Sequence, residues 1–216
     1  MLMQDEREAI VEYSIKLIEH GLTKGTGGNI SIFNRREKIM AISPSGLEYN
    51  KTKPEDIVIL DLKGDKIEGN RKPSSEYHLH RIFYERRDDC NSVVHAHSMF
   101  SGVLACLRWT LPASHYMIAL AGKDVRCAEY ATFGTQQLAE NAFEAMKYRN
   151  AVLLANHGLL AVSKDLPNAF NTAEEIEFCS EMYYRARCVG EPFILSDEEM
   201  VLIGEKFQSY GQVKSK

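Results

Sequence analysis

The 216-residue sequence lacks the features that mark several protein classes. Its five cysteines contain no C-x-x-C pair, so we expect reduced thiols rather than disulfides. The formal net charge is only -4, with both signs interspersed, which argues against a nucleic-acid partner. No run approaches the ~20 apolar residues of a membrane span, and the acidic start MLMQDEREAI lacks the apolar core of a signal peptide. We therefore expect a cytoplasmic protein with no membrane partner.

Nucleotide-binding motifs are also missing. The Gly-rich stretch TKGTGGNIS has Ile30 where G-x-G-x-x-G needs a glycine, and it follows an expected helix rather than a strand. No G-x-x-x-x-G-K-[ST] motif occurs. This loop, and the turn SPSG at 43–46, could still bind an anion through backbone amides. On its own, each is better explained as an ordinary turn.

Hydrophobic periodicity predicts one α/β domain over residues 1–216, with a mixed sheet and no internal repeat, low-complexity tract or linker. We expect helices at 5–20, from 73–75 to 87, at 135–148, from 167 to 190, and from the capping box at 196–199 onward. Strands are expected in ISIF, KIMAIS, DIVILDL, SVVHAHSM and on both sides of 156–158, and a turn region at 63–70.

His95 and His97 stand two residues apart in the apolar stretch NSVVHAHSMF. On a strand, such residues share a face, with Cα atoms about 6.6 Å apart. Both imidazoles could therefore reach one metal ion, at roughly 2.0–2.1 Å per zinc–nitrogen bond. The spacing alone fits equally well with two hydrogen-bonded core histidines.

His78 and His80 provide an internal control, because they have the same spacing in an expected helix. Two residues subtend about 200° around a helix, so these two side chains diverge. We do not expect them to chelate one ion together.

Two further residues favour a metal site. His157 interrupts an apolar stretch next to Gly158, where a side chain more often faces a cleft than a core. Three imidazoles with a carboxylate or water form an open tetrahedral zinc site. Glu76 could supply the carboxylate, and the amides near Ser74 and Ser75 could bind phosphate at a helix start. Taken alone, this Ser-Ser-Glu is also an ordinary N-terminal cap.

The stretches GTGGNIS, SPSG, PSSE, HAH and NHG, in this order and spacing, resemble the class II aldolase family. HYMIA, CAEYATFGT, LSDEE and EKFQSYG narrow the resemblance to members that cleave L-fuculose 1-phosphate. The similarity covers nearly the whole chain. SPSG stands where the family often has TPTG, and Asn156 precedes the third histidine, where it could alter contacts around the metal.

The resemblance implies a three-layer α/β/α sandwich around a mixed, mostly antiparallel sheet. It implies a cytoplasmic homotetramer with one Zn²⁺ per subunit and active sites at subunit interfaces. The implied reaction, in fucose degradation, is the cleavage of L-fuculose 1-phosphate to dihydroxyacetone phosphate and L-lactaldehyde. A divalent metal would stabilise the enediolate as a Lewis acid.

Site residues carry over motif by motif. The implied metal ligands are His95, His97, His157 and Glu76, and Glu76 then acts as the acid/base. A neighbouring subunit would contribute Tyr116 and Tyr210. The implied substrate and phosphate site consists of Gly28, Asn29, Ser45, Gly46, Ser74 and Ser75.

Three rival hypotheses remain. L-Ribulose-5-phosphate 4-epimerases share the fold and the metal histidines but have aspartate at the position of Glu76, which favours the aldolase. A dehydratase acting on methylthioribulose 1-phosphate is a weaker rival. A structural zinc site in a binding protein would be closed, whereas three histidines with a displaceable glutamate form an open site.

Overall fold

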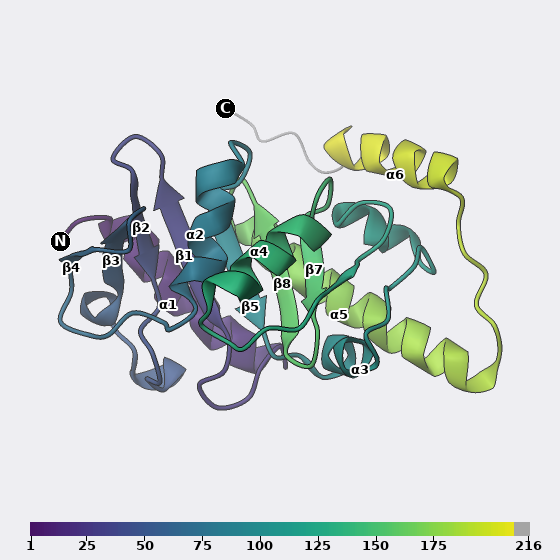
Figure 1. Cartoon of the computed structure of the whole chain (residues 1–216), viewed down its shortest axis with the longest axis horizontal. Helices are drawn as coiled ribbons and strands as arrows, with labels where there is room; N and C mark the ends of the chain where they lie inside the picture. The colour runs from purple at the N-terminus through teal and green to yellow at the C-terminus, as the bar shows by residue number, and fades with distance from the viewer. Residues whose placement is uncertain (210–216) are drawn as a thin grey trace.

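The computed structural model describes residues 1–209. Eight strands lie side by side in one sheet, in the order β4-β3-β2-β1-β5-β8-β7-β6 (Figure 1). The neighbouring strands are antiparallel except for the parallel pair β6–β7. The prediction of a mixed, mostly antiparallel sheet is therefore confirmed. The strands are β1 Asn29–Asn34, β2 Ile39–Ile42, β3 Val58–Asp61, β4 Lys66–Glu68, β5 Ser92–Ala96, β6 Cys127–Ala128, β7 Ala151–Leu154 and β8 Gly158–Ser163.

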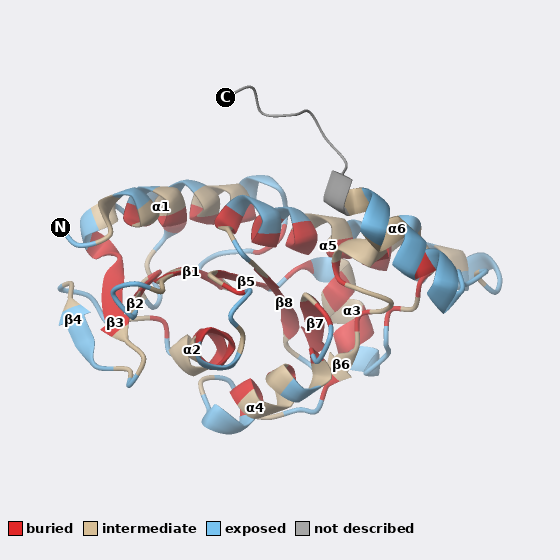
Figure 2. Ribbon diagram, turned by 90° about the horizontal axis from the view of Figure 1, so that it is seen from above, coloured by how far each residue is buried: buried red, intermediate tan, exposed pale blue. Residues whose placement is uncertain are grey.

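Helices cover both faces of this sheet. Seen from above, α1 and α5 lie on one side of the strands and α2 and α4 on the other, which gives the predicted three layers (Figure 2). No helix of the described chain is long and apolar enough to cross a bilayer. The α-helices are α1 Gln4–Glu19, α2 Tyr77–Arg86, α3 Met99–Leu107, α4 Gln136–Ala145, α5 Leu166–Val189 and α6 Asp197–Ser209, and the short 3₁₀ helices are η1 Tyr49–Lys51, η2 Pro54–Asp56 and η3 Tyr116–Leu120.

The central strands are apolar on both faces because each face packs against a helical layer. On β5, Val94 joins the core that includes Ile10 of α1 and Ile176 of α5. Its neighbour Val93 joins the opposite core, with Phe83 of α2. Successive strand side chains point to opposite faces, so a continuous apolar run fills two cores at once.

The structure corrects several boundaries. Strand β5 ends at Ala96, so His97 lies just after the strand and not inside it. Helix α2 begins at Tyr77, which makes Glu76 its N-cap residue, whereas we expected the helix to start at 73–75. Helix α4 ends at Ala145, three residues early, and Tyr148 beyond it adopts a φ of 61°.

Strand β4 and helix α3 are among the elements that were not expected from the sequence. Strand β4 lies within the stretch predicted as a turn, and only two of its residues pair with β3, across a register shift. Such a short edge strand carries too little alternation to be recognised. Helix α3 follows the His-x-His stretch and is apolar on nearly every side, which removes the periodic signal of a surface helix.

Candidate metal centre and active site

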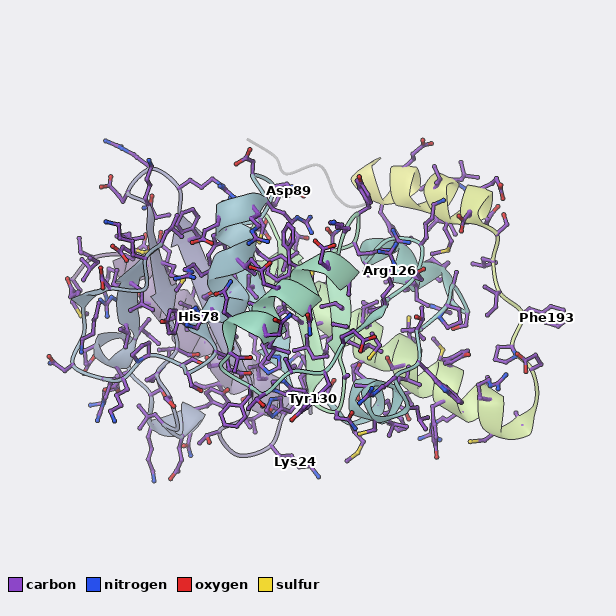
Figure 3. The ribbon with its side chains drawn as sticks, in the orientation of Figure 1. Lys24, His78, Asp89, Arg126, Tyr130 and Phe193 are labelled. Atoms are coloured by element: carbon purple, nitrogen blue, oxygen red, sulfur yellow. The ribbon has the colours of Figure 1, made fainter. Side chains whose placement is uncertain are left out.

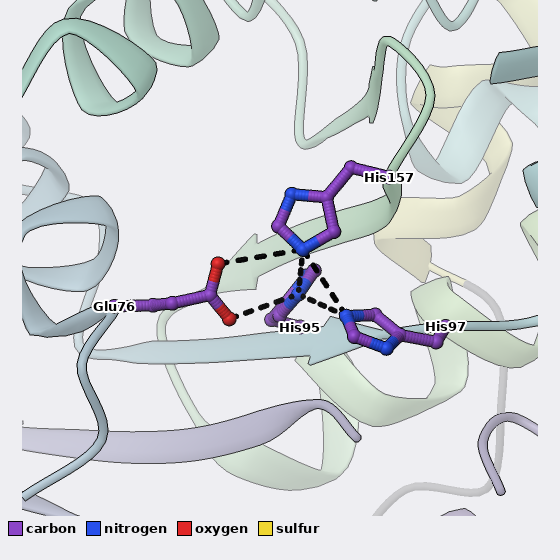
Figure 4. Close-up of side chains that lie close together, drawn as sticks. All are labelled: Glu76, His95, His97 and His157. Atoms are coloured by element: carbon purple, nitrogen blue, oxygen red, sulfur yellow. Dashed lines mark hydrogen bonds and ion pairs between the residues drawn. The ribbon is translucent and has the colours of Figure 1, made fainter. Parts of the chain in front are cut away.

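Four side chains from three parts of the fold converge on one point and form a candidate metal site, the metal group (Figure 4). His95 comes from β5, His97 from the residue after Ala96, His157 from the β7–β8 connection and Glu76 from the start of α2. One ligand atom from each lies within 4.8 Å of the others. The sequence hypothesis named these same four residues, and the structure brings all four together.

The Nε2 atoms of the histidines form a small triangle. They are separated by 3.0 Å between His95 and His97, 3.2 Å between His95 and His157, and 3.1 Å between His97 and His157. The carboxylate of Glu76 closes the group, with Oε2 3.3 Å from His95 Nε2 and Oε1 3.4 Å from His157 Nε2. Ligand atoms at zinc-bond distance in a tetrahedron are about 3.3–3.4 Å apart, so these spacings fit a single small cation.

Hydrogen bonding around the group also fits a cation. His95 Nδ1 lies 2.9 Å from the carbonyl oxygen of Leu159, which can only accept, so Nδ1 carries the hydrogen. The Nε2 lone pair of His95 is then left facing the centre, as metal-binding histidines require. Within residues 1–209, the buried Oε1 of Glu76 has no hydrogen-bond partner. Burying a carboxylate oxygen without a partner costs free energy unless a cation or a substrate group pairs with it.

Close backbone packing positions the two histidine segments. A Cβ at Gly158 would lie 2.3 Å from the carbonyl oxygen of Ala96, so only glycine lets β8 approach the end of β5. Gly28 has a φ of 78°, and a Cβ there would lie 2.6 Å from the carbonyl oxygen of His95. These glycines explain why GTGGN and NHG flank the His-x-His strand.

Electrostatics keep Glu76 ionised. Burial alone would raise the pKa of Glu76, but the His95 and His157 rings and the Asn29 amide outweigh it, and the net shift is downward. Burial would lower the pKa of His95, yet the adjacent Glu76 carboxylate raises it overall. The carboxylate is therefore available as a ligand or base near neutral pH.

The other two imidazoles are held neutral. Burial and the neighbouring His95 lower the pKa of both His97 and His157 to about 4. Neutral imidazoles present the lone pairs that a metal needs. His95 is fully buried while His97 is exposed, so the group is open on one side. An open side is a feature of catalytic rather than structural metal sites.

The expected phosphate loops lie beside this group. SPSG and KPSS are joined by a bridge between Pro44 and Pro73, and the amide of Ser45 donates to Lys72 at 3.0 Å. The amide of Ser74 in turn donates to Ser43, at 3.1 Å. Loops separated by some thirty residues in the sequence are thereby placed together. Ser45, Gly46 and Ser75 are exposed at this junction, and their role in binding phosphate stays a prediction.

Asn29, expected in the substrate and phosphate site, makes its side-chain hydrogen bonds within the protein, and its role in binding phosphate stays a prediction. Its side chain is buried, and Nδ2 donates to Glu76 Oε2 at 3.0 Å. Its Oδ1 lies 2.5 Å from His80 Nε2. The amide side chain of Asn29 is therefore engaged within the protein.

A hollow of about 330 Å³ opens onto the metal group. Glu76, His97 and His157 line it together with Tyr130 and Phe133. Neither aromatic residue was named as a site residue from the sequence, although both stand in CAEYATFGT. The hollow thus combines candidate metal ligands with aromatic side chains.

The two tyrosines expected from a neighbouring subunit remain untested. Tyr116 begins η3, is 49% exposed, and has the rings of His115 and Phe207 next to it. No described contact within residues 1–209 joins Tyr116 to the metal group. Tyr210 lies outside the described residues.

Comparisons with known proteins agree with this geometry. The family model described as "Class II Aldolase and Adducin N-terminal domain" matches residues 8–184. A 5-deoxy-D-ribulose 1-phosphate aldolase of Bacillus thuringiensis serovar kurstaki is 58% identical, over 98% of this chain and 100% of the relative. An L-fuculose phosphate aldolase of Escherichia coli is 40% identical, over 94% of each chain. A solved structure described as L-fuculose 1-phosphate aldolase has a TM-score of 0.94 and 54% identity, covering 96% of this chain and 98% of the other.

Proposed function

This chain belongs to the class II aldolase family, and we propose that it uses a metal ion to cleave a 1-phosphorylated 2-ketose between C3 and C4. The products of such a cleavage are dihydroxyacetone phosphate and an aldehyde. The observation that carries the proposal is the open group of three imidazoles and one ionised carboxylate beside the phosphate loops.

The favoured substrate is 5-deoxy-D-ribulose 1-phosphate, and L-fuculose 1-phosphate, expected from the sequence motifs, is the second candidate. The relative that acts on the first is more similar to this chain, at 58% against 40% identity. The 54% identical solved structure described as an L-fuculose 1-phosphate aldolase supports the second. Both sugars release dihydroxyacetone phosphate and a short aldehyde that ends in a methyl group. Phe133 and Tyr130 offer that methyl group an apolar wall.

The chain's own residues have distinct tasks in this reaction. Cleavage removes a proton from the C4 hydroxyl and adds one at C3 as the C3–C4 bond breaks. Glu76 moves the proton at C3. Its ionised carboxylate, whose Oε1 has no hydrogen-bond partner within the described chain, takes this proton from dihydroxyacetone phosphate in the condensation direction, and the carboxylic acid so formed gives it back to C3 in cleavage. Tyr116 serves the oxygen at C4. Backbone amides and serines of the phosphate loops, Ser45 and Ser74 among them, anchor C1 and orient the sugar.

His95, His97, His157 and Glu76 would hold the metal. The three-nitrogen, one-oxygen donor set and its spacing favour Zn²⁺, which is the metal we propose. When bound, the cation supplies Lewis-acid stabilisation of the negative charge that develops on the substrate oxygens.

The assembly we propose is a homotetramer in which Tyr116 of one subunit reaches the site of the next. The end of α5 and the connection that follows it support an interface, because Val189 is 90% exposed and Phe193, labelled in Figure 3, is 98% exposed. Exposed apolar side chains in one segment are typical of protein contacts.

A comparison of three substrates tests the activity. Purified metal-loaded protein is given 5-deoxy-D-ribulose 1-phosphate, L-fuculose 1-phosphate and L-ribulose 5-phosphate in turn, and kcat/KM is measured for each. We expect cleavage of the first two, with the higher kcat/KM for 5-deoxy-D-ribulose 1-phosphate. Epimerisation of L-ribulose 5-phosphate without cleavage of either 1-phosphate would overturn the aldolase assignment.

Subunit mixing tests the shared site. Glu76→Gln and Tyr116→Phe proteins are denatured, combined in equal amounts and reassembled. If neighbouring chains share sites in a head-to-tail ring, roughly a quarter of the sites in the hybrids are intact. Activity well above the sum of the two parents supports sharing, whereas activity equal to that sum assigns Tyr116 to its own chain.

A further inference from the structure

A line of buried polar side chains ends at Glu76. The Tyr84 hydroxyl of α2 lies 2.5 Å from Ser31 Oγ of β1, and Ser31 Oγ lies 2.6 Å from His80 Nδ1. His80 Nε2 lies 2.5 Å from Asn29 Oδ1, and Asn29 Nδ2 donates to Glu76 Oε2 at 3.0 Å. All five residues are buried, and His80 is completely buried. Hydrogen bonds between buried polar side chains hold those side chains in one arrangement.

The hydrogens along this line can point in only one direction while Glu76 is ionised. The carboxylate needs a donor, so the NH₂ of Asn29 faces Glu76 and its carbonyl oxygen faces His80. His80 must then donate from Nε2, and a neutral imidazole that donates from Nε2 accepts at Nδ1. Ser31 therefore donates to His80 and accepts from Tyr84. The opposite direction would set the Asn29 oxygen against the carboxylate.

This arrangement makes the two oxygens of Glu76 unequal. Oε2 accepts from Asn29 and lies beside His95. Oε1 has no hydrogen-bond partner within the described chain and lies on the His157 side, at the hollow that Glu76 also lines. Holding one oxygen in place aims the other, because a carboxylate is planar and rigid.

We propose that His80 is a positioning residue of the cleavage reaction: through Asn29 it holds Oε2 of Glu76 and thereby leaves Oε1 aimed at the proton on C3. This inference rests on the proposed function, because it refines the task of Glu76 within it. Within the described chain, the His80 ring forms its hydrogen bonds with Asn29 and Ser31, and His80 does not line the hollow. Its effect is transmitted by the orientation of one amide.

Two substitutions of His80 separate positioning from packing. His80→Phe keeps a flat buried ring but removes both nitrogens, whereas His80→Gln keeps a donor that can reach Asn29 Oδ1. The matched control is His78→Phe, on the same helix, because His78 contacts Tyr77 and Gln136 and lies outside the polar line.

The readouts are kcat and KM for cleavage, bound metal per chain, and the exchange of the C3 proton of dihydroxyacetone phosphate with solvent deuterium. Loss of groups that orient metal-site ligands typically costs 10–100-fold, so we expect a decrease of about that size in kcat and in proton exchange for His80→Phe. Metal content and KM should stay close to wild type. His80→Gln should recover most of the rate, and His78→Phe should match wild type.

A double substitution tests the route through Asn29. If His80 acts by way of Asn29, then Asn29→Ala combined with His80→Phe is no slower than Asn29→Ala alone. If the two losses multiply instead, the proposed route is wrong. Equal rates for His80→Phe and wild type would also overturn the inference.

If His80→Phe does not fold, a second variant tests the inference. Ser31→Ala removes the donor to His80 Nδ1 and leaves His80 free to change tautomer, so a smaller decrease in proton exchange is expected in a protein that is still folded. An unchanged exchange rate in folded Ser31→Ala would contradict the inference. Failure of the proposed function is distinct, because the wild-type protein would then show no exchange at all.

Discussion

His95 lies in strand β5 and His97 directly follows it, whereas His78 and His80 stand at the same spacing on helix α2. The strand pair converges, with Nε2 atoms 3.0 Å apart, and contributes two ligand atoms to one metal group. The helix pair diverges: His80 is fully buried against Asn29 and Ser31, while His78 lies against Tyr77 and is labelled on the face of α2 in Figure 3.

The difference shows that the spacing of two histidines has chemical meaning only together with the backbone that carries it. Extended backbone returns to the same face after two residues, and a helix turns by about 200°. Yet the helix pair is not inert, because His80 connects to Glu76 through Asn29. One pair supplies ligands, and one member of the other supports the carboxylate.

The largest difference in bound metal and in cleavage rate is expected between His97→Ala and His78→Ala. His97→Ala removes one of three imidazoles from the metal group, so bound metal and cleavage should both fall to background. His78→Ala should leave both near wild type. Metal analysis of the two purified proteins, beside their rates, measures the contrast. Equal metal loss in both would mean that spacing and geometry do not separate the pairs.

Glu76→Gln should give the next largest effect. The amide keeps the size of the side chain and some hydrogen bonding but has no basic oxygen, and loss of a general base typically costs 10²–10⁴-fold. We expect turnover and proton exchange of dihydroxyacetone phosphate to fall in parallel, with unchanged circular dichroism. Wild-type exchange in this variant would place the base elsewhere.

Gly158→Ala should weaken metal binding by His95 and His97 indirectly. Its Cβ would lie 2.3 Å from the carbonyl oxygen of Ala96, next to His97. Forcing extra atoms into close packing typically costs about 1–3 kcal/mol, so we expect lower thermal stability and weaker metal binding. Gly204→Ala, in α6, is the control, because a Cβ there meets nothing within 4 Å. Equal stability of the two variants would contradict the packing account.

His80 of the helix pair should contribute to the pH dependence of the free energy of unfolding. Burial, with a smaller contribution from His95, lowers the pKa of His80 to about 3, so this ring stays neutral in the folded protein while it takes up a proton in the unfolded chain below about 6.5. The resulting stability is present above pH 6.5 and is lost as the pH falls toward 3.

Denaturant unfolding of metal-free protein at several pH values measures this loss. His80→Gln does not titrate, so between pH 7 and 4.5 it should lose about 2 kcal/mol less unfolding free energy than the wild type. Parallel pH curves for the two proteins would show that His80 is not held neutral.

Much of the site could be predicted from the sequence because its residues stand out from their surroundings. The histidines at 95, 97 and 157 lie within apolar segments, where an ionisable side chain is rarely buried without a partner. The glutamate at 76 directly follows two serines at a helix start. The layers of the fold follow from the apolar positions along α1, from the start and stop signals at Pro167 and Gly190 that bound α5, and from apolar runs such as AVLL.

The remaining features depend on contacts that no local pattern encodes. The tasks of His80 and Asn29 require β1 to lie against α2, some fifty positions along the chain. Strand β4 exists because β3 offers it an edge, and helix α3 is hidden by its uniform apolarity. Tertiary packing, not propensity, decides such segments.

Metal titration of activity tests the central claim most directly. Protein is freed of metal with a chelator, and Zn²⁺ is added back stepwise while bound metal and the rate of cleavage of 5-deoxy-D-ribulose 1-phosphate are measured together. We expect no turnover without metal, a rate that rises in proportion to bound Zn²⁺, and a plateau at one ion per chain. Undiminished turnover in the chelated protein would contradict the claim.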